Sequence, residues 1–84
     1  MKNHTNHDKK LSRVLLALQS LCSDEDASDT LPSPELWPKT RHIADYCGID
    51  IYASRRYLMQ LVKNHQAYVS SSAINNSLRW YIVK

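Results

Sequence analysis

The residues of this chain that are best suited to chemistry are cationic and hydrogen-bonding side chains concentrated between residues 39 and 63. Arg55 and Arg56 are adjacent, and arginine can hydrogen-bond both to phosphates and to the edges of bases. Two adjacent arginines can also belong to an ordinary solvent-exposed helix face. The structural elements around them decide whether a binding site or an ordinary surface is the better interpretation. The candidate nucleic-acid-binding residues are Lys39, Thr40, Arg41, Tyr52, Arg55, Arg56, Lys63 and Arg79.

The segment from Lys39 to Lys63 has the pattern of a helix-turn-helix. Gly48, the only glycine of the chain, stands where a left-handed backbone would end one helix. We expect a short helix before it, with Thr40 as its N-cap and Ala44 small enough to allow close crossing of the two helices. Ile49 would fill the space between the helices. The turn therefore predicts a short helix that precedes the arginine-bearing helix and packs against it.

The second helix is expected to begin at Ile51, with Asp50 as its N-cap, and to end near His65. Helical spacing predicts an inner face of Ile51, Ser54, Tyr57, Leu58, Leu61 and Val62, and an outer face of Tyr52, Ala53, Arg55, Arg56, Met59, Gln60 and Lys63. The arginines then lie in the N-terminal half of the helix, the part that a recognition helix presents to DNA.

Length and composition indicate one small cytoplasmic domain, residues 1–84. The hydrophobic fraction of 43% and charged fraction of 23% are those of a globular protein, and no apolar run approaches a membrane span or a signal peptide. Cys22 and Cys47 occupy apolar helical positions, which favours buried thiols over a disulfide.

Charge is distributed by segment. Residues 1–22 carry four basic residues and one acid, residues 23–37 carry five acids and no base, and residues 38–84 carry seven bases and two acids. A basic C-terminal half next to an acidic loop fits a surface that binds a polyanion.

A first helix is expected from about Asp8 to Cys22, because Leu11, Val14, Leu15, Leu18, Leu21 and Cys22 recur at helical spacing. Residues 1–7 would form a disordered tail. Residues 23–38, with three prolines and five acids, should form an extended loop. Trp37 is expected to fold back onto the core, with a partner-binding epitope as the alternative. Leu16, outside the apolar stripe, could lie at the core margin or contact a second copy.

After the second helix, alternation predicts strands at Ala67 to Ser71 and Ser77 to Val83, with Asn75 and Asn76 at a turn with positive φ. Leu78, Trp80 and Ile82 would face the core, and Arg79, Tyr81 and Val83 the opposite side. Such a hairpin would be a wing, from which Arg79 could reach a phosphate or the minor groove. The expected fold class is mainly α with a small β-hairpin: a winged helix-turn-helix of three helices and a two-stranded wing.

Other chemistry has little support in the sequence. The four histidines and two cysteines lack the clustered spacing of zinc ligands, so we expect no metal site. There is no glycine-rich phosphate loop or nucleophile motif, and the serines at 70–72 suit a hairpin tip better than catalysis. We expect neither enzymatic activity nor a cofactor.

The segment Lys39 to Leu61 resembles the PapI/FaeA/PefI family of small bacterial regulators of fimbrial operons. The resemblance rests on Thr40-Arg41, Ile43-Ala44, Gly48, Tyr52 and Arg55-Arg56-Tyr57-Leu58. It implies a winged-helix transcription regulator that acts beside a leucine-responsive-type global regulator protein, with Tyr52, Arg55 and Arg56 nearest the DNA. Two features depart from the family pattern: the acidic proline-rich insertion is long, and Ser54 replaces a branched apolar residue. A hydroxyl there must find a carbonyl partner or loosen the packing.

The sequence thus predicts a transcription regulator that binds double-stranded DNA with helix 51–63 in the major groove. The alternative is a protein-binding module, such as an antirepressor or adaptor, on the same fold. The salt dependence of binding separates the two, because only phosphate contacts release counterions. The DNA site, the direction of regulation, the oligomeric state and any small effector are left open by the sequence.

Overall fold

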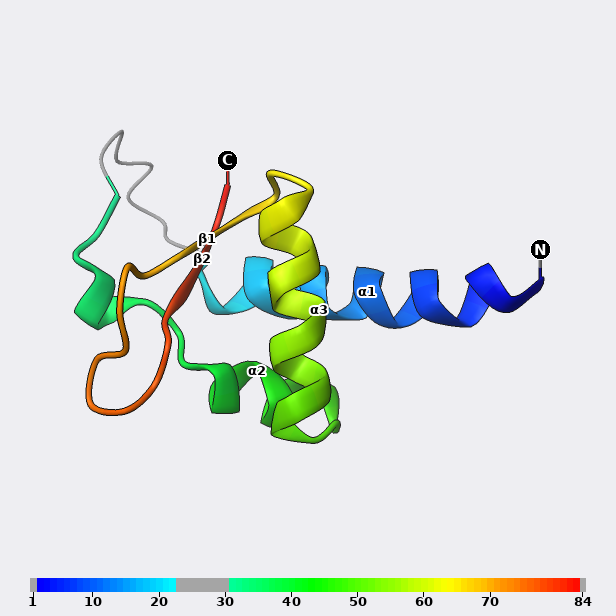
Figure 1. Cartoon of the computed structure of the whole chain (residues 1–84), viewed down its shortest axis with the longest axis horizontal. Coiled ribbons are helices and arrows are strands. Elements are labelled where there is room, and N and C mark those ends of the chain that lie inside the picture. Colours follow the sequence, from blue (N-terminus) through cyan, green and yellow to red (C-terminus); the bar gives the residue numbers. More distant parts are fainter. Residues whose placement is uncertain (1, 23–30, 84) are drawn as a thin grey trace.

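The computed structural model describes residues 2–22 and 31–83 of the chain. In chain order its elements are α1 (Lys2–Leu21), the short 3₁₀ helix η1 (Pro34–Leu36), α2 (Thr40–Cys47), α3 (Ile51–Lys63), β1 (Ala67–Val69) and β2 (Trp80–Ile82). Figure 1 shows α3 crossing in front of α1, with α2 below and the hairpin to one side. This is the winged helix-turn-helix arrangement, so the predicted fold class is confirmed.

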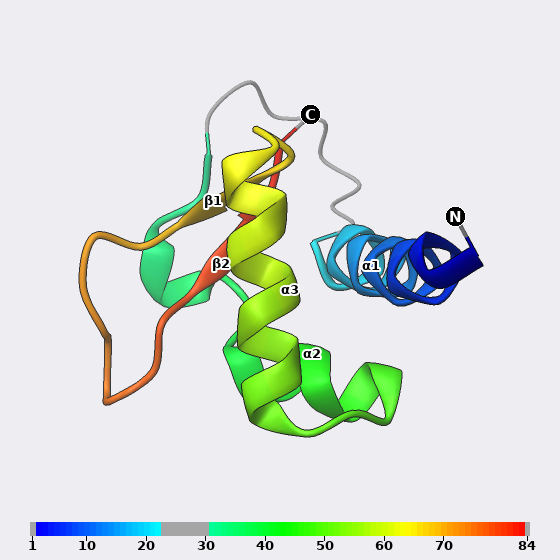
Figure 2. The same cartoon turned by 45° about the vertical axis from the view of Figure 1, so that its right-hand side comes forward.

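Helix α1 supplies one wall of the core. Val14, Ala17 and Leu18 are buried against the other elements, and each large apolar side chain contributes up to about 1.5–3 kcal/mol. The helix begins at Lys2 rather than near Asp8, so the segment expected to be a disordered tail is helical from its second residue. Figures 1 and 2 show its N-terminal part projecting away from the other elements. None of the helices that the structure describes is long and apolar enough to cross a membrane.

The turn between α2 and α3 is built as its sequence predicts. Gly48 adopts a left-handed conformation with φ 69°. The N–H of Ile49 donates to the carbonyl of Ala44 at 3.0 Å and that of Gly48 to the carbonyl of Asp45 at 3.3 Å, the two bonds of a Schellman motif. The Asp50 carboxylate then accepts the N–H of Ala53 at 2.7 Å and caps α3. Backbone groups at both helix ends are thereby satisfied within five residues of chain.

The start of α2 differs from the prediction. The N-cap is Lys39, and Thr40 is the first helical residue. The imidazole Nδ1 of His42, at the third helical position, accepts the backbone N–H of Lys39 at 3.3 Å, which is one of the two contacts of a capping box. The Thr40 side chain is therefore available for a different contact.

The wing is a two-stranded antiparallel hairpin, shorter than expected at both strands. Tyr68 pairs with Tyr81, and an additional bridge between Lys39 and Arg79 extends the pairing of the second strand to the residue that precedes α2. Asn75 and Asn76 have positive φ, as expected, and so does His65 directly after α3. The indole of Trp80 is fully buried in the core.

The outer face of β2 is covered, contrary to the prediction. Arg79 and Tyr81 are both buried, because residues 34–37 fold back over this side of the hairpin. The Trp37 ring lies 5.6 Å from the ring of Tyr81, and its Nε1 donates to the carbonyl of Pro32 at 2.9 Å. The expectation that Trp37 joins the core is confirmed. Residues 23–30, the most acidic part of the predicted loop, lie outside the described residues.

Gly48→Ala should destabilise the protein by about 1 kcal/mol, measured as a lower urea midpoint by far-UV circular dichroism. A left-handed conformation costs an L-residue about 1–2 kcal/mol, partly offset by a smaller unfolded-state entropy. A Cβ would meet no atom within 4 Å, so crowding adds nothing to this cost. Gly48→Asn, which tolerates positive φ better, should lose less. Equal stability of Gly48→Ala and the wild type would contradict this assignment.

Candidate nucleic-acid interface

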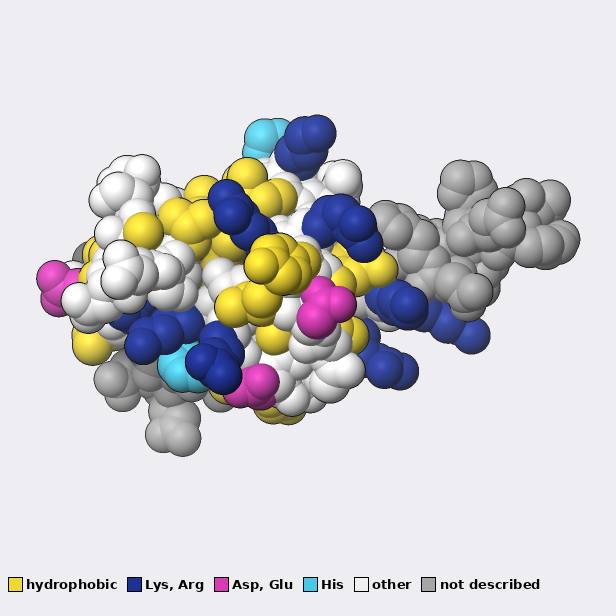
Figure 3. All heavy atoms as spheres, turned by 60° about the horizontal axis from the view of Figure 1, so that its bottom comes forward, with side chains coloured by type: hydrophobic (Ala, Val, Ile, Leu, Met, Phe, Trp, Pro, Cys, Tyr) yellow, Lys and Arg dark blue, Asp and Glu magenta, His cyan; other side chains and the backbone are white. Residues whose placement is uncertain are grey.

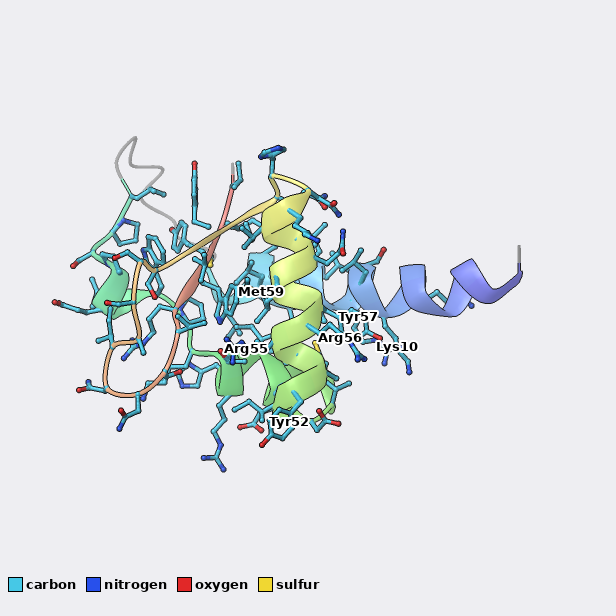
Figure 4. All side chains as sticks on the ribbon, viewed as in Figure 1. Lys10, Tyr52, Arg55, Arg56, Tyr57 and Met59 are labelled. Atoms are coloured by element: carbon cyan, nitrogen blue, oxygen red, sulfur yellow. The ribbon has the colours of Figure 1, made fainter. Side chains whose placement is uncertain are left out.

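The solvent side of α3 carries most of the predicted binding residues. Burial of Ser54, Tyr57, Leu58 and Leu61 fixes the rotation of the helix about its axis, and the opposite side is left outward. Tyr52 is 83% exposed, and Arg55 and Arg56 are exposed beside it. Figure 4 shows the labelled side chains on α3, with Tyr52 near the start of the helix and Arg55 and Arg56 further along it. A shallow groove of about 430 Å³ runs along this face, lined by Tyr52, Arg55, Arg56, Met59, Gln60 and Lys63.

A second groove of about 410 Å³ separates the N-terminal half of α3 from the wing. Tyr52 and Arg55 line both grooves, and therefore stand on the ridge between them. The wing side of this groove is formed by Ala73, Asn76, Ser77 and Leu78. A ligand that covers the ridge would touch α3 and the wing at the same time.

Arg56 is partly positioned by its own helix. Its guanidinium carbon lies 5.8 Å from the centroid of the Tyr57 ring, within the range of a cation–π contact. Tyr57 is itself buried, so its ring is a fixed support. Among the residues that the structure describes, Arg55 has no such contact, so its side chain is less restrained than that of Arg56. The two neighbouring arginines thus differ in freedom.

The angle between α2 and α3 depends on a buried hydroxyl. Ser54 is completely buried, and its Oγ donates to the backbone carbonyl of Thr40 at 3.3 Å. The hydroxyl that interrupts the apolar face of α3 is thereby satisfied by the neighbouring helix instead of by its own. A small side chain at this position also lets the two helices approach closely.

Two of the predicted contact residues do not reach the surface. Thr40 is buried, and its Oγ1 accepts the indole N–H of Trp80 at 2.8 Å. Arg79 is buried, and its guanidinium donates to the carbonyls of Glu35 at 2.7 Å, Trp37 at 3.4 Å and Ile74 at 3.5 Å. Both side chains hold elements together, and Thr40 also lines the groove between α3 and the wing.

The prediction that Arg79 faces solvent is wrong for a specific reason. Alternation along residues 78–83 predicts that Arg79 faces solvent, but that inference assumes a hairpin with one covered side. The segment at 34–37 adds a further layer, and its backbone carbonyls receive the guanidinium. No pattern in the acidic, proline-rich sequence indicates this docking except the apolar Trp37.

The remaining predicted cations stay at the surface. Arg41, Arg55, Arg56 and Lys63 are exposed and Lys39 is half-buried. Within residues 9–22 and 31–83, none of them forms an ion pair with a carboxylate. Figure 3 shows dark-blue side chains over α3 and near the start of α2 on one face of the molecule. Their charge is available to an anionic ligand.

One apolar residue of this face was not predicted to be exposed. Ile51 was expected inside but is 43% exposed, and it lines the groove next to the wing. It lies in the first turn of α3, at the edge of the contact with α2, where the core no longer covers it. Together with Tyr52 and Met59 it adds apolar contact area to a basic surface.

With this geometry in place, comparison with known proteins is informative. Residues 35–73 match the family model of FaeA-like proteins. The FaeA-like segment spans α2, α3 and the first half of the wing, and it contains Tyr52, Arg55 and Arg56. The resemblance seen in the helix-turn-helix sequence is confirmed. No curated protein matches the chain significantly.

The fold extends beyond the FaeA-like segment. A crystal structure of a candidate DNA-binding protein from Ralstonia eutropha JMP134 superposes with a TM-score of 0.68 at 21% sequence identity. The match covers 90% of this chain and 83% of the other. The shared architecture therefore includes most of the chain outside the FaeA-like segment.

Thr40→Val should destabilise the fold by about 1–3 kcal/mol, because the buried indole N–H of Trp80 loses its acceptor. Urea unfolding followed by far-UV circular dichroism measures the loss. Thr40→Ser keeps the hydroxyl and should lose clearly less. If the Val and Ser variants are equally stable, the hydrogen bond contributes nothing and the interpretation is wrong.

Proposed function

We propose that the protein is a transcription regulator that binds double-stranded DNA through the exposed face of α3. The supporting observation is the solvent side of this helix, where Tyr52, Arg55, Arg56 and Lys63 are exposed. None of these three cations forms an ion pair with a carboxylate of the described residues. An α-helix fits the major groove of B-DNA, and a bidentate arginine–guanine contact contributes about 1–3 kcal/mol of discrimination. The regulator acts by binding and carries out no catalytic step.

The two arginines have different roles in this proposal. Arg55, on the ridge between the grooves and free to adjust, contacts a base edge. Arg56, held over Tyr57, presents its charge to a phosphate. Tyr52 and Met59 provide apolar contact, for which the methyl group of thymine is the matching surface in the major groove. Lys39 and Arg41 contact the backbone from the start of α2, and the wing lies over the adjacent backbone.

The more specific part of the proposal, the target promoter and the partner protein, is based on the FaeA-like segment. We propose that the target is the promoter of a fimbrial or virulence-type operon, and that a leucine-responsive-type global regulator is the partner protein. A small recognition surface with one or two base contacts supports a need for such a partner, because its discrimination between sites is limited. Binding to a fimbrial promoter fragment with and without that regulator tests this assignment.

The DNA-binding proposal is tested by fluorescence anisotropy with a labelled duplex of random sequence at several salt concentrations. Log K should fall linearly with log salt, with a slope of about −0.9 for each phosphate neutralised. The double variant Arg55→Ala/Arg56→Ala should make the slope shallower by up to about 2 and weaken binding at least tenfold.

The matched control is Ser12→Glu/Gln19→Glu, which lowers the net charge by the same amount on the exposed side of α1 opposite its buried stripe. It should keep a slope close to that of the wild type. DNA binding without salt dependence, or unchanged binding by the arginine variant, would exclude α3 as a DNA-binding element and favour a protein ligand.

A further inference from the structure

Helix α1 carries cations that the helix-turn-helix does not account for. Lys9, Lys10 and Arg13 are exposed, and spacings of one, three and four residues place them on one side of a helix. The buried stripe is formed by Val14, Ala17 and Leu18. The cations therefore form a basic flank beside that stripe, while the side opposite the stripe is formed by Ser12, Leu16 and Gln19.

The basic flank lies on the side of the helix-turn-helix. The Cys47 thiol, at the end of α2, contacts the backbone carbonyl of Arg13 at 3.8 Å. Burial raises the pKa of that thiol, and the positive charge of Arg13 opposes the rise. The residue after Cys47 is Gly48, from which the chain enters α3 within three residues.

The figures agree with this placement. Figure 4 shows Lys10 on α1 just beyond the crossing with α3, on the side where Arg56 and Tyr57 are labelled. In Figure 3, dark-blue side chains over α3 continue toward the side where α1 leaves the core. No ion pair with a carboxylate among residues 9–22 and 31–83 neutralises Lys9, Lys10 or Arg13.

The position of this charge matters for a helix docked in DNA. A helix in the major groove lies between two sugar-phosphate backbones, about 12 Å apart. Figures 1 and 2 show the start of α2 and the N-terminal part of α1 on opposite sides of α3, so the cations of each element can meet one backbone. Basic side chains on both sides of a groove-binding helix fix its register.

We propose that Lys9, Lys10 and Arg13 form a phosphate-binding surface on α1 that contacts the backbone beside the groove occupied by α3. The inference rests on the proposed DNA-binding function and extends its footprint to an element outside the FaeA-like segment. The ligand group is the phosphodiester, recognised without regard to base sequence.

The test compares the full chain with the triple variant Lys9→Gln/Lys10→Gln/Arg13→Gln on a random-sequence 25-base-pair duplex. The slope of log K against log salt should become shallower by about 2 to 3, and affinity should fall by a similar factor on random and promoter sequences. The charge-conserving variant Lys9→Arg/Lys10→Arg/Arg13→Lys should keep the wild-type slope. Far-UV circular dichroism and the urea midpoint verify that each variant is folded.

The matched control is Ser12→Glu/Leu16→Glu/Gln19→Glu, which changes the net charge of the same helix by the same amount on the side opposite the buried stripe. It should leave the slope within about one unit of the wild type. A wild-type slope in the Gln variant, or equal changes in the Gln and Glu variants, overturns the role of α1 and leaves that of Arg55 and Arg56 standing. Loss of salt dependence in the wild type itself would instead overturn the proposed function.

Discussion

The arrangement of the site depends on Thr40, where three elements meet through two hydrogen bonds. Its hydroxyl accepts the indole N–H of Trp80 from β2, and its carbonyl accepts the hydroxyl of Ser54 from α3. All three residues are buried, so an unpaired group at any of them would cost about 1–3 kcal/mol. Hydrogen bonds also depend on the relative orientation of donor and acceptor, whereas apolar packing alone does not. This junction consequently sets the angle between α3 and the wing, and with it the groove that contains Arg55.

Two kinds of cation in this molecule have separate roles. Arg79 is buried among backbone carbonyls and joins the segment at 34–37 to the hairpin, while its Nε has no hydrogen-bond partner among the described residues. The cations of α3 and of the basic flank of α1 are exposed, so their charges are accessible to solvent or to a ligand. Burial therefore distinguishes an internal, structural arginine from one that is accessible to a ligand, where residue type cannot.

Much of the fold follows from local signals. A unique glycine, the Asp50 cap and helical spacing of apolar residues predict α2 and α3 to within two residues, because each signal acts over a few residues. The exposure of Arg55 and Arg56 follows from the same spacing. The bounds of α1 and the strands were less accurate, since charged helix ends and short strands carry weak periodicity.

What the sequence could not indicate depends on long-range contacts. Thr40 and Arg79 have the chemistry of DNA ligands, and only the docking of Trp80 against α2 and of residues 34–37 against β2 shows that they are internal. The position of α1 beside the exposed face of α3 likewise depends on how the two helices cross. Neither propensity nor motif contains that information for residues more than thirty positions apart.

The most direct test of the central claim is a nuclear magnetic resonance titration of the ¹⁵N-labelled protein with a short DNA duplex. If α3 docks in the major groove, the largest amide shifts should fall on α3 from Tyr52 to Lys63 and extend to the wing residues Asn76 and Ser77. Shifts confined to residues outside α3 and the wing, with the α3 signals unmoved, would contradict the claim.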